Sequence, residues 1–208
     1  SVTGTEFSDV YQIEDYHVSA TAGSDYFVMG MGSSDQNTYG LVQNANYNSD
    51  GSINDISSDY SADMDILYVS WLPEGVVVDA NFGQVSHGSG GPGSTADDVY
   101  TDYFAGIEVF DLTQYDDYFT GGGEVDINWI DPGSGNDEIH GVGSVFTVLD
   151  YSSVSNDFGV DFHNEGLVSN VPLGTSAVTI ENAENYDGAV LLDNGDVDIY
   201  RNVDYFIG

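Results

Sequence analysis

The sequence predicts an all-β fold in which short strands stack as a solenoid with mostly parallel pairing. Short apolar runs alternate with clusters of Gly, Asp, Asn and Ser, a pattern typical of strands that end in turns. No window of a dozen residues has a helical apolar stripe, and the helix formers Lys and Arg are almost absent. Similar segments also recur in the same order along the chain, as they do in stacked repeats.

The clearest strands are short apolar runs bounded by turn residues. These runs are Gly75–Asp79, Val125–Ile130, Val145–Leu149 and Ala189–Leu192. Two stretches are expected to be loops instead. Residues 33–61 are rich in Asn, Ser, Asp and Gly, which predicts a long surface excursion, and the Gly/Ser-rich stretch 86–95 predicts an exposed loop.

Self-similarity suggests two degenerate repeat units, at about residues 65–141 and 147–208. Leu67–Ser70 resembles Leu149–Ser152, and Asn136–Gly141 resembles Val203–Gly208. Residues 1–60 lack a full copy of this unit and are predicted to form an N-terminal cap or first coil with a long polar excursion. Residues 61–208 would then hold the two units, with a boundary near residue 60.

The charge of the chain limits its partners. The sequence has 36 acidic residues against 1 basic residue, a formal net charge of −35. This charge repels nucleic acid and anionic membrane surfaces. The sequence also has no run of 18 apolar residues, so it predicts no insertion into a membrane. The acidic residues are 27 Asp and 9 Glu, a bias that favours tight turns and metal loops, although a solvated halophilic surface is the open alternative.

The glycine-rich turn before Asp137 predicts a calcium site. Gly133 and Gly135 punctuate this turn, and Asp137 is followed two residues later by the apolar Ile139. Glycine reaches positive φ and lets the backbone turn sharply, so carbonyl oxygens and one carboxylate can face a cation. The alternative is a plain turn capped by Asp137.

The same turn resembles the calcium-binding nonapeptide of the RTX (repeats-in-toxin) proteins, G-G-x-G-x-D-x-U-x, in which U is a large apolar residue. Pro132 stands in place of the first Gly, and Ile139 occupies the U position. The resemblance covers about residues 65–208 and the turns near Asp9 and Asp25. It implies a right-handed parallel β-roll or β-helix solenoid with long surface loops, built from degenerate units of a large bacterial protein that leaves the cell by type I secretion.

In the RTX family one calcium ion is shared between the turns of adjacent coils, so a single nonapeptide needs a partner turn. The Asp-Tyr-Phe copies that begin at Asp25, Asp117 and Asp204 are the candidates. The resemblance therefore implies metal ligands at a defined set of positions. These are Gly133, Gly135, Asp137, Asp117, Asp25 and Asp204.

Other polar clusters are expected to have structural roles. Asp116 and Asp117 are adjacent, and adjacent residues of a strand point to opposite faces, so they are not predicted to form a catalytic pair. None of the four histidines has zinc-binding spacing, and each is predicted to be a surface or loop residue. They are His17, His87, His140 and His163.

These observations favour a non-catalytic, calcium-stabilised structural or adhesive module of an extracellular or surface assembly, such as an adhesin, surface layer, filament or virion surface. Its expected partners are calcium ions, other copies of itself or other surface proteins, and glycans, with no nucleic acid and no membrane insertion. Two alternatives stay open. One is a carbohydrate-binding module that uses its 15 Tyr and 2 Trp residues, and the other is a polysaccharide-acting enzyme on a parallel β-helix.

Overall fold

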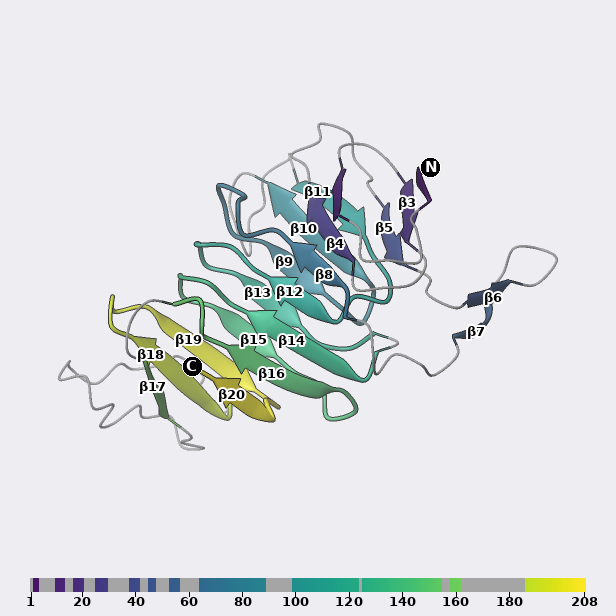
Figure 1. Ribbon diagram of the computed structural model, residues 1–208. Helices are drawn as coiled ribbons and strands as arrows, with labels where there is room; N and C mark the ends of the chain where they lie inside the picture. Colours follow the sequence, from purple (N-terminus) through teal and green to yellow (C-terminus); the bar gives the residue numbers. More distant parts are fainter. Residues whose placement is uncertain are drawn as a thin grey trace.

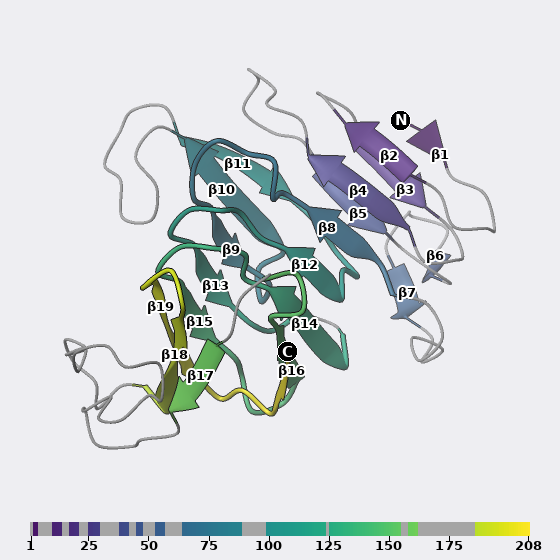
Figure 2. The same ribbon diagram turned by 60° about the vertical axis from the view of Figure 1, so that its left-hand side comes forward.

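The computed structural model contains two large β-sheets that lie face to face as two layers (Figure 1, Figure 2). It describes residues 2–3, 10–13, 17–20, 25–29, 38–41, 45–47, 53–56, 64–88, 99–123, 125–154, 158–161 and 186–208. Every regular element in these ranges is a strand. The predicted all-β class is therefore confirmed for the described part of the chain. Within that part, no helix is long and apolar enough to cross a bilayer.

The smaller of the two sheets has seven strands, and all of its neighbours pair in parallel. In spatial order they are β2 (Val10–Ile13), β4 (Tyr26–Met29), β8 (Ile66–Tyr68), β12 (Val109–Asp111), β14 (Ile127–Asp131), β16 (Phe146–Asp150) and β20 (Tyr205–Ile207). Each strand is short, so one or two inward side chains per strand reach the core.

The larger sheet has eleven strands and mixes parallel with antiparallel pairs. In spatial order they are β1 (Val2–Thr3), β3 (His17–Ala20), β5 (Thr38–Leu41), β11 (Val99–Tyr103), β10 (Gln84–Gly88), β9 (Val77–Asp79), β13 (Tyr118–Thr120), β15 (Glu138–His140), β19 (Val197–Arg201), β18 (Gly188–Leu192) and β17 (Phe158–Asp161). A separate hairpin pairs β6 (Ala45–Tyr47) with β7 (Ile53–Ile56).

From β12 to β16 the chain places successive strands alternately in the two sheets. The register of this region repeats every 20 residues: Phe110 lies opposite Ile130 in one sheet, and Phe119 lies opposite Ile139 in the other. Parallel neighbours require a crossover, and here the crossover is the passage through the opposite sheet. The turns that precede β13 and β15 are thereby stacked on one another.

The core lies between the two sheets. Phe110 from the seven-stranded sheet packs edge-on against Phe119 from the larger sheet, with ring centres 5.0 Å apart. Tyr200 and Phe206 make an equivalent contact nearer the C-terminal end, also at 5.0 Å. Edge-to-face packing of this kind adds about 0.5–1.5 kcal/mol to the burial of each pair. Most of the aromatic residues that the structure describes as fully buried fill this layer.

The expected right-handed parallel β-roll or β-helix solenoid is wrong. Neither sheet closes, and the larger sheet contains the antiparallel runs β9–β10–β11 and β17–β18–β19. The turn at Ala80–Gly83 shows the reason. Gly83 has a φ of +61° and its N–H donates to the carbonyl of Ala80 (3.3 Å), so the chain reverses within its own sheet instead of crossing to the other.

The predicted strands coincide with β9, β14, β16 and β18, shifted by one or two residues at their ends. The two stretches predicted as loops contain strands. Ser86–Gly88 belongs to β10, and β5, β6 and β7 lie inside the expected polar excursion, while the remainder of both stretches falls outside the described residues. The Asp9 turn and His163 also fall outside them.

One of the two sequence matches places equivalent strands together. Leu67–Ser70 and Leu149–Ser152 both contribute strands to the seven-stranded sheet. Asn136–Gly141 contains β15 of the larger sheet, however, whereas Val203–Gly208 contains β20 of the smaller one. The division of the chain into an N-terminal part and two repeat units stays a prediction.

Candidate functional site

The six predicted metal ligands lie in two separate parts of the fold. Asp117 and Asp137 immediately precede β13 and β15 of the larger sheet, and Gly133 and Gly135 form the turn that leads to Asp137. Asp25 and Asp204 instead precede strands β4 and β20 of the seven-stranded sheet. The structure therefore places Asp117 next to Asp137 in the larger sheet, whereas Asp25 and Asp204 lie at the seven-stranded sheet.

Asp117 and Asp137 belong to a stack of three carboxylates that we term the buried ladder, completed by Asp198 before β19. The backbone N–H of Val76 donates to Oδ1 of Asp117 at 2.7 Å. The N–H of Asp117 donates to Oδ1 of Asp137 at 2.8 Å, and that of Asp137 donates to Oδ1 of Asp198 at 3.0 Å. Each carboxylate thus accepts a hydrogen bond from a buried backbone N–H just before the neighbouring strand. Leaving such a buried N–H without an acceptor would cost free energy.

The second carboxylate oxygens of the ladder differ in their surroundings. Oδ2 of Asp117 accepts from the N–H and the hydroxyl of Thr113, at 2.8 and 3.0 Å. Oδ2 of Asp198 accepts from the hydroxyl of Tyr151 at 2.8 Å. Oδ2 of Asp137 is buried and has no hydrogen-bond partner among the described residues. The middle rung is therefore the least satisfied as an anion.

Burial raises the pKa of all three acids. Asp117, Asp137 and Asp198 are 2%, 1% and 0% exposed. Loss of solvation raises the pKa of Asp117 and of Asp198 from 3.8 to about 7. The pKa of Asp137 is raised well above 3.8 by burial and then by the charges of Asp198 and Asp117. At neutral pH the ladder therefore retains protons that an exposed Asp would have lost.

A second set of carboxylates performs the same task in the seven-stranded sheet. The N–H of Asp25 donates to Oδ1 of Asp65 at 2.8 Å, and the N–H of Asp65 donates to Oε2 of Glu108 at 2.9 Å. At the other end of the sheet, Oδ2 of Asp204 accepts from the N–H of Thr147 at 2.8 Å. The predicted ligands Asp25 and Asp204 thus connect neighbouring strands of this sheet.

The glycines of the predicted calcium turn allow two turns to stack closely. Gly133 and Gly135 have φ values of +78° and +128°. A Cβ added to Gly133 would lie 2.0 Å from the carbonyl oxygen of Thr113, and one added to Gly135 would lie 2.6 Å from that of Tyr115. The turn at 132–136 therefore lies directly on the turn one rung earlier, and only glycine fits both positions.

Most carboxylate oxygens around Asp137 are already engaged in hydrogen bonds. Calcium takes six to eight oxygen ligands, whereas both Oδ1 atoms of Asp117 and Asp137 already accept backbone hydrogen bonds and Oδ2 of Asp117 is bonded to Thr113. Only Oδ2 of Asp137 is left, and no group of three or more acidic or His residues converges on one point within the described ranges. Calcium binding stays a prediction.

Sequence reasoning missed Asp198, Asp65 and Glu108 as equivalents of Asp137. A usable signal was present, because each ladder acid stands two residues before a core side chain at the start of a strand: Asp137 before Ile139, and Asp198 before Tyr200. The separation along the sequence hid this equivalence. Asp117 and Asp137 are 20 residues apart, but Asp137 and Asp198 are 61 apart, because β17 and β18 intervene.

Two histidines predicted to be at the surface are buried instead. His87 is 7% exposed, with Nε2 3.5 Å from Asp102. His140 is 8% exposed, with Nε2 2.8 Å from Glu138, and burial lowers its pKa. His87 lies on the same face of β10 as the core residue Val85. The ring of His140 packs against the rings of Tyr118 and Tyr186. His163 and the side chain of His17 lie outside the described residues.

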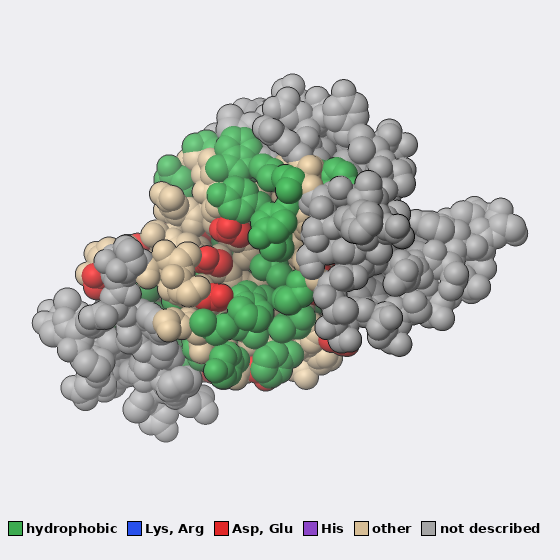
Figure 3. Space-filling view, in the orientation of Figure 1, with side chains coloured by type: hydrophobic (Ala, Val, Ile, Leu, Met, Phe, Trp, Pro, Cys, Tyr) green, Lys and Arg blue, Asp and Glu red, His purple; other side chains and the backbone are tan. Residues whose placement is uncertain are grey.

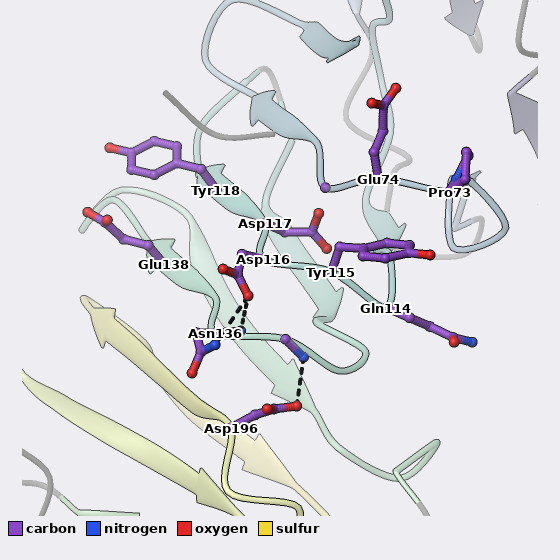
Figure 4. Close-up of a pocket in the computed structure, with 12 residues that line it drawn as sticks. Pro73, Glu74, Gln114, Tyr115, Asp116, Asp117, Tyr118, Asn136, Glu138 and Asp196 are labelled. Carbon is purple, nitrogen blue, oxygen red and sulfur yellow. Dashed lines mark hydrogen bonds between the residues drawn. The ribbon is translucent and has the colours of Figure 1, made fainter. Parts of the chain in front are cut away.

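An open groove of about 720 Å³ runs over the stacked turns (Figure 4). Its floor is held by side chains that link one turn to the next: Oδ1 of Asp116 accepts from the N–H of Asn136 (2.9 Å), and Oδ2 of Asp196 accepts from that of Gly135 (3.1 Å). Asp116 is exposed while Asp117 is buried, and both lie in the turn before β13. Asp116 and Asp196 therefore serve to hold neighbouring turns together.

We found no match to this chain among protein-family models, curated proteins or solved structures.

Proposed function

We propose that this chain is a non-catalytic structural module of an extracellular or surface assembly, and that its sheets lock together when the buried ladder is electrically neutral. The observation that carries the proposal is the position of Asp137. Its carboxyl group is buried between Asp117 and Asp198, and its Oδ2 has no partner in the described part of the chain.

The cost of charging the ladder is large compared with the stability of a domain. A pKa raised from 3.8 to about 7, as for Asp117 and Asp198, corresponds to a penalty on the order of 4 kcal/mol for the ionised form of each group. A domain of this kind is stable by about 5–15 kcal/mol in total. Protonation of these groups therefore changes the free energy of unfolding by an amount comparable with the whole stability of the domain.

The role in an assembly is supported by the edges of the two sheets. Among the described strands, β2 and β20 end the smaller sheet and β1 and β17 end the larger one. An edge strand offers backbone groups that can pair with another chain. The acidic composition keeps such a module soluble and discourages contact with nucleic acid.

The test is urea unfolding of the wild type and of Asp137→Asn in the presence of a chelator, at about pH 5 and about pH 8. The wild type is expected to be more stable at the lower pH, and the substitution to reduce this difference. If the wild type unfolds in chelator at both pH values and refolds only with calcium, protonation is not what locks the fold and the proposal fails.

A further inference from the structure

The outer surface of the seven-stranded sheet presents an apolar row that crosses six strands. Its members lie opposite one another in the strand register and alternate with the inward-facing core residues. They are Tyr26, Ile66, Val109, Trp129, Val148 and Tyr205. Tyr26 and Tyr205 are 43% and 57% exposed, Ile66, Val109 and Trp129 are half-buried, and Val148 is buried at 2% exposed.

An acidic row lies beside the apolar row, two residues further along three neighbouring strands. Asp111 lies opposite Asp131, and Asp150 follows Leu149, which lies opposite Ile130. The row is held in place by its neighbours: the indole N–H of Trp129 donates to Oδ2 of Asp150 at 2.9 Å, and the hydroxyl of Ser153 donates to Oδ1 of Asp131 at 2.8 Å.

Like charges on adjacent strands are unfavourable. Burial and the charge of Asp131 raise the pKa of Asp111 to about 6, and burial, with the charge of Asp150, raises the pKa of Asp131. A cation bound alongside would relieve this repulsion. Figure 3 shows the two rows as a band of hydrophobic side chains with acidic side chains next to it, over the region of β12, β14 and β16.

We propose that this face, which we term the docking face, binds a cationic amphipathic helix of another protein, with apolar side chains on the apolar row and Lys or Arg on the acidic row. The negative charge of this chain determines that the partner's contacting surface is positively charged. A second copy of the chain carries the same net charge of −35 and has a single Arg, so it is repelled at this face and a basic partner is attracted.

The spacing of the rows favours a helix over an extended strand. Neighbouring strands lie about 4.8 Å apart, so six strands span about 24 Å. Successive turns of a helix lie about 5.4 Å apart, close to this spacing, and a helix of about 16 residues covers the span. Side chains on one face of a strand recur about every 6.7 Å and lose register with the rows sooner.

Binding of a labelled synthetic helical peptide, followed by fluorescence anisotropy, tests the docking face. The peptide carries a stripe of Leu beside a stripe of Lys. One control replaces each Lys with Glu, and a second keeps every Lys but replaces each Leu with Ser. Because any polycation is attracted to so acidic a protein, the second control separates docking from general attraction. The expected result is that only the Leu/Lys peptide binds tightly at moderate salt.

Matched variants of the protein locate the binding. Asp111→Asn with Asp131→Asn is expected to weaken binding by about tenfold, whereas Asp126→Asn with Asp193→Asn removes the same charge from exposed positions elsewhere and leaves binding unchanged. Tyr205→Ser is likewise expected to weaken binding by about tenfold, in contrast to Phe82→Ser, which alters a residue that is 70% exposed and lies outside the docking face.

Equal binding of both Lys-containing peptides, or equal loss in the two double variants, would overturn the proposal in favour of general attraction. Binding of an insoluble neutral polysaccharide that Tyr205→Ser abolishes, without peptide binding, would overturn it in favour of a glycan platform. The inference extends the assembly part of the proposed function. Urea unfolding keeps the two apart, since a wild-type protein that shows the expected pH-dependent stability but does not bind the Leu/Lys peptide counts against the docking face alone.

Discussion

At Asp137, burial and neighbouring charge act in the same direction. The side chain is removed from water, and Asp117 and Asp198 lie on either side of it in the ladder. Most buried carboxylates in proteins are compensated by a cation or by several N–H donors. Here Oδ1 has one donor, and Oδ2 has none among the described residues. A proton is the simplest compensation.

Replacing Asp137 with Asn is expected to stabilise the protein relative to the wild type as the pH rises. The amide is nearly isosteric, its oxygen can still accept from the N–H of Asp117, and it never ionises. Between about pH 5 and about pH 8, the free energy of unfolding of the variant relative to the wild type should rise by about 2 kcal/mol or more. Urea unfolding at both pH values measures this.

The matched control is Asp126→Asn, which removes a carboxylate at an exposed position on the loop before β14. Its stability relative to the wild type should change little with pH, because its side chain is exposed to solvent and does not belong to the buried ladder. An equal response in the two variants would show that the pH effect comes from total charge and not from the ladder.

Replacing Tyr151 with Phe is expected to destabilise the protein by about 1–3 kcal/mol. Tyr151 is 1% exposed and donates its hydroxyl to Oδ2 of Asp198 at 2.8 Å. Loss of this donor leaves a buried oxygen less satisfied, and the loss should be greater at about pH 8 than at about pH 5 because an ionised carboxylate depends more on its donor. Thermal unfolding at the two pH values checks both the size and the trend.

At the scale of elements, the stacked turns before β13 and β15 set the spacing of the ladder. The sequence pattern correctly indicated a sharp glycine turn at 132–136, because Gly, Asn and Asp are the residues such turns require. The pattern could not show what the turn touches. The contact of Gly133 with the carbonyl of Thr113 depends on the register between β12 and β14, which is a property of the folded molecule.

Replacing Gly133 with Ala is expected to cost about 3 kcal/mol or more of unfolding free energy. Its φ is +78°, and the new Cβ would lie 2.0 Å from the oxygen of Thr113, so backbone must move. Gly143→Ala is the control, because Gly143 is exposed and nothing lies within 4 Å of the Cβ position. Comparable midpoints of urea unfolding for the two variants would argue against tight stacking of the turns.

At the scale of the whole molecule, the β class and several strands follow from short apolar runs, but the arrangement of the sheets does not. A run such as Val77–Asp79 looks the same whether the next strand crosses to the other sheet or returns as a hairpin. The choice is made by the turn at Ala80–Gly83 and by pairing with β11, which begins at Val99. Long-range pairing of this kind leaves little trace in local composition.

The acidity of the chain was also open to more than one interpretation. The sequence is compatible with calcium loops and with a halophilic surface, and it gives no direct sign that buried acids accept backbone hydrogen bonds between strands. Only the folded register shows that Asp117, Asp137 and Asp198 stack on one another. Asp117 and Asp137 therefore lie next to each other in the fold, and calcium binding by their turns stays a prediction.

Stability of the whole chain is expected to fall as the pH rises through about 7. Folding raises the pKa of Asp117 and Asp198 from 3.8 to about 7, so between these values the folded state holds more protons than the unfolded chain. The contribution is complete below about pH 4 and is lost as the pH passes about 7. Because salt screens buried charges weakly, the trend should persist in about 1 M NaCl, as unfolding curves across this range would show.

The most direct measurement is a pH titration of the side-chain carboxyl carbons by carbon-13 NMR in the presence of a chelator, with Asp137→Asn used to assign the resonance of Asp137. Asp137 is expected to be protonated at neutral pH and to titrate well above the ordinary value of 3.8. An Asp137 resonance that titrates near 4, or that shifts at neutral pH when calcium but not magnesium is added, would show that a proton does not neutralise the buried ladder.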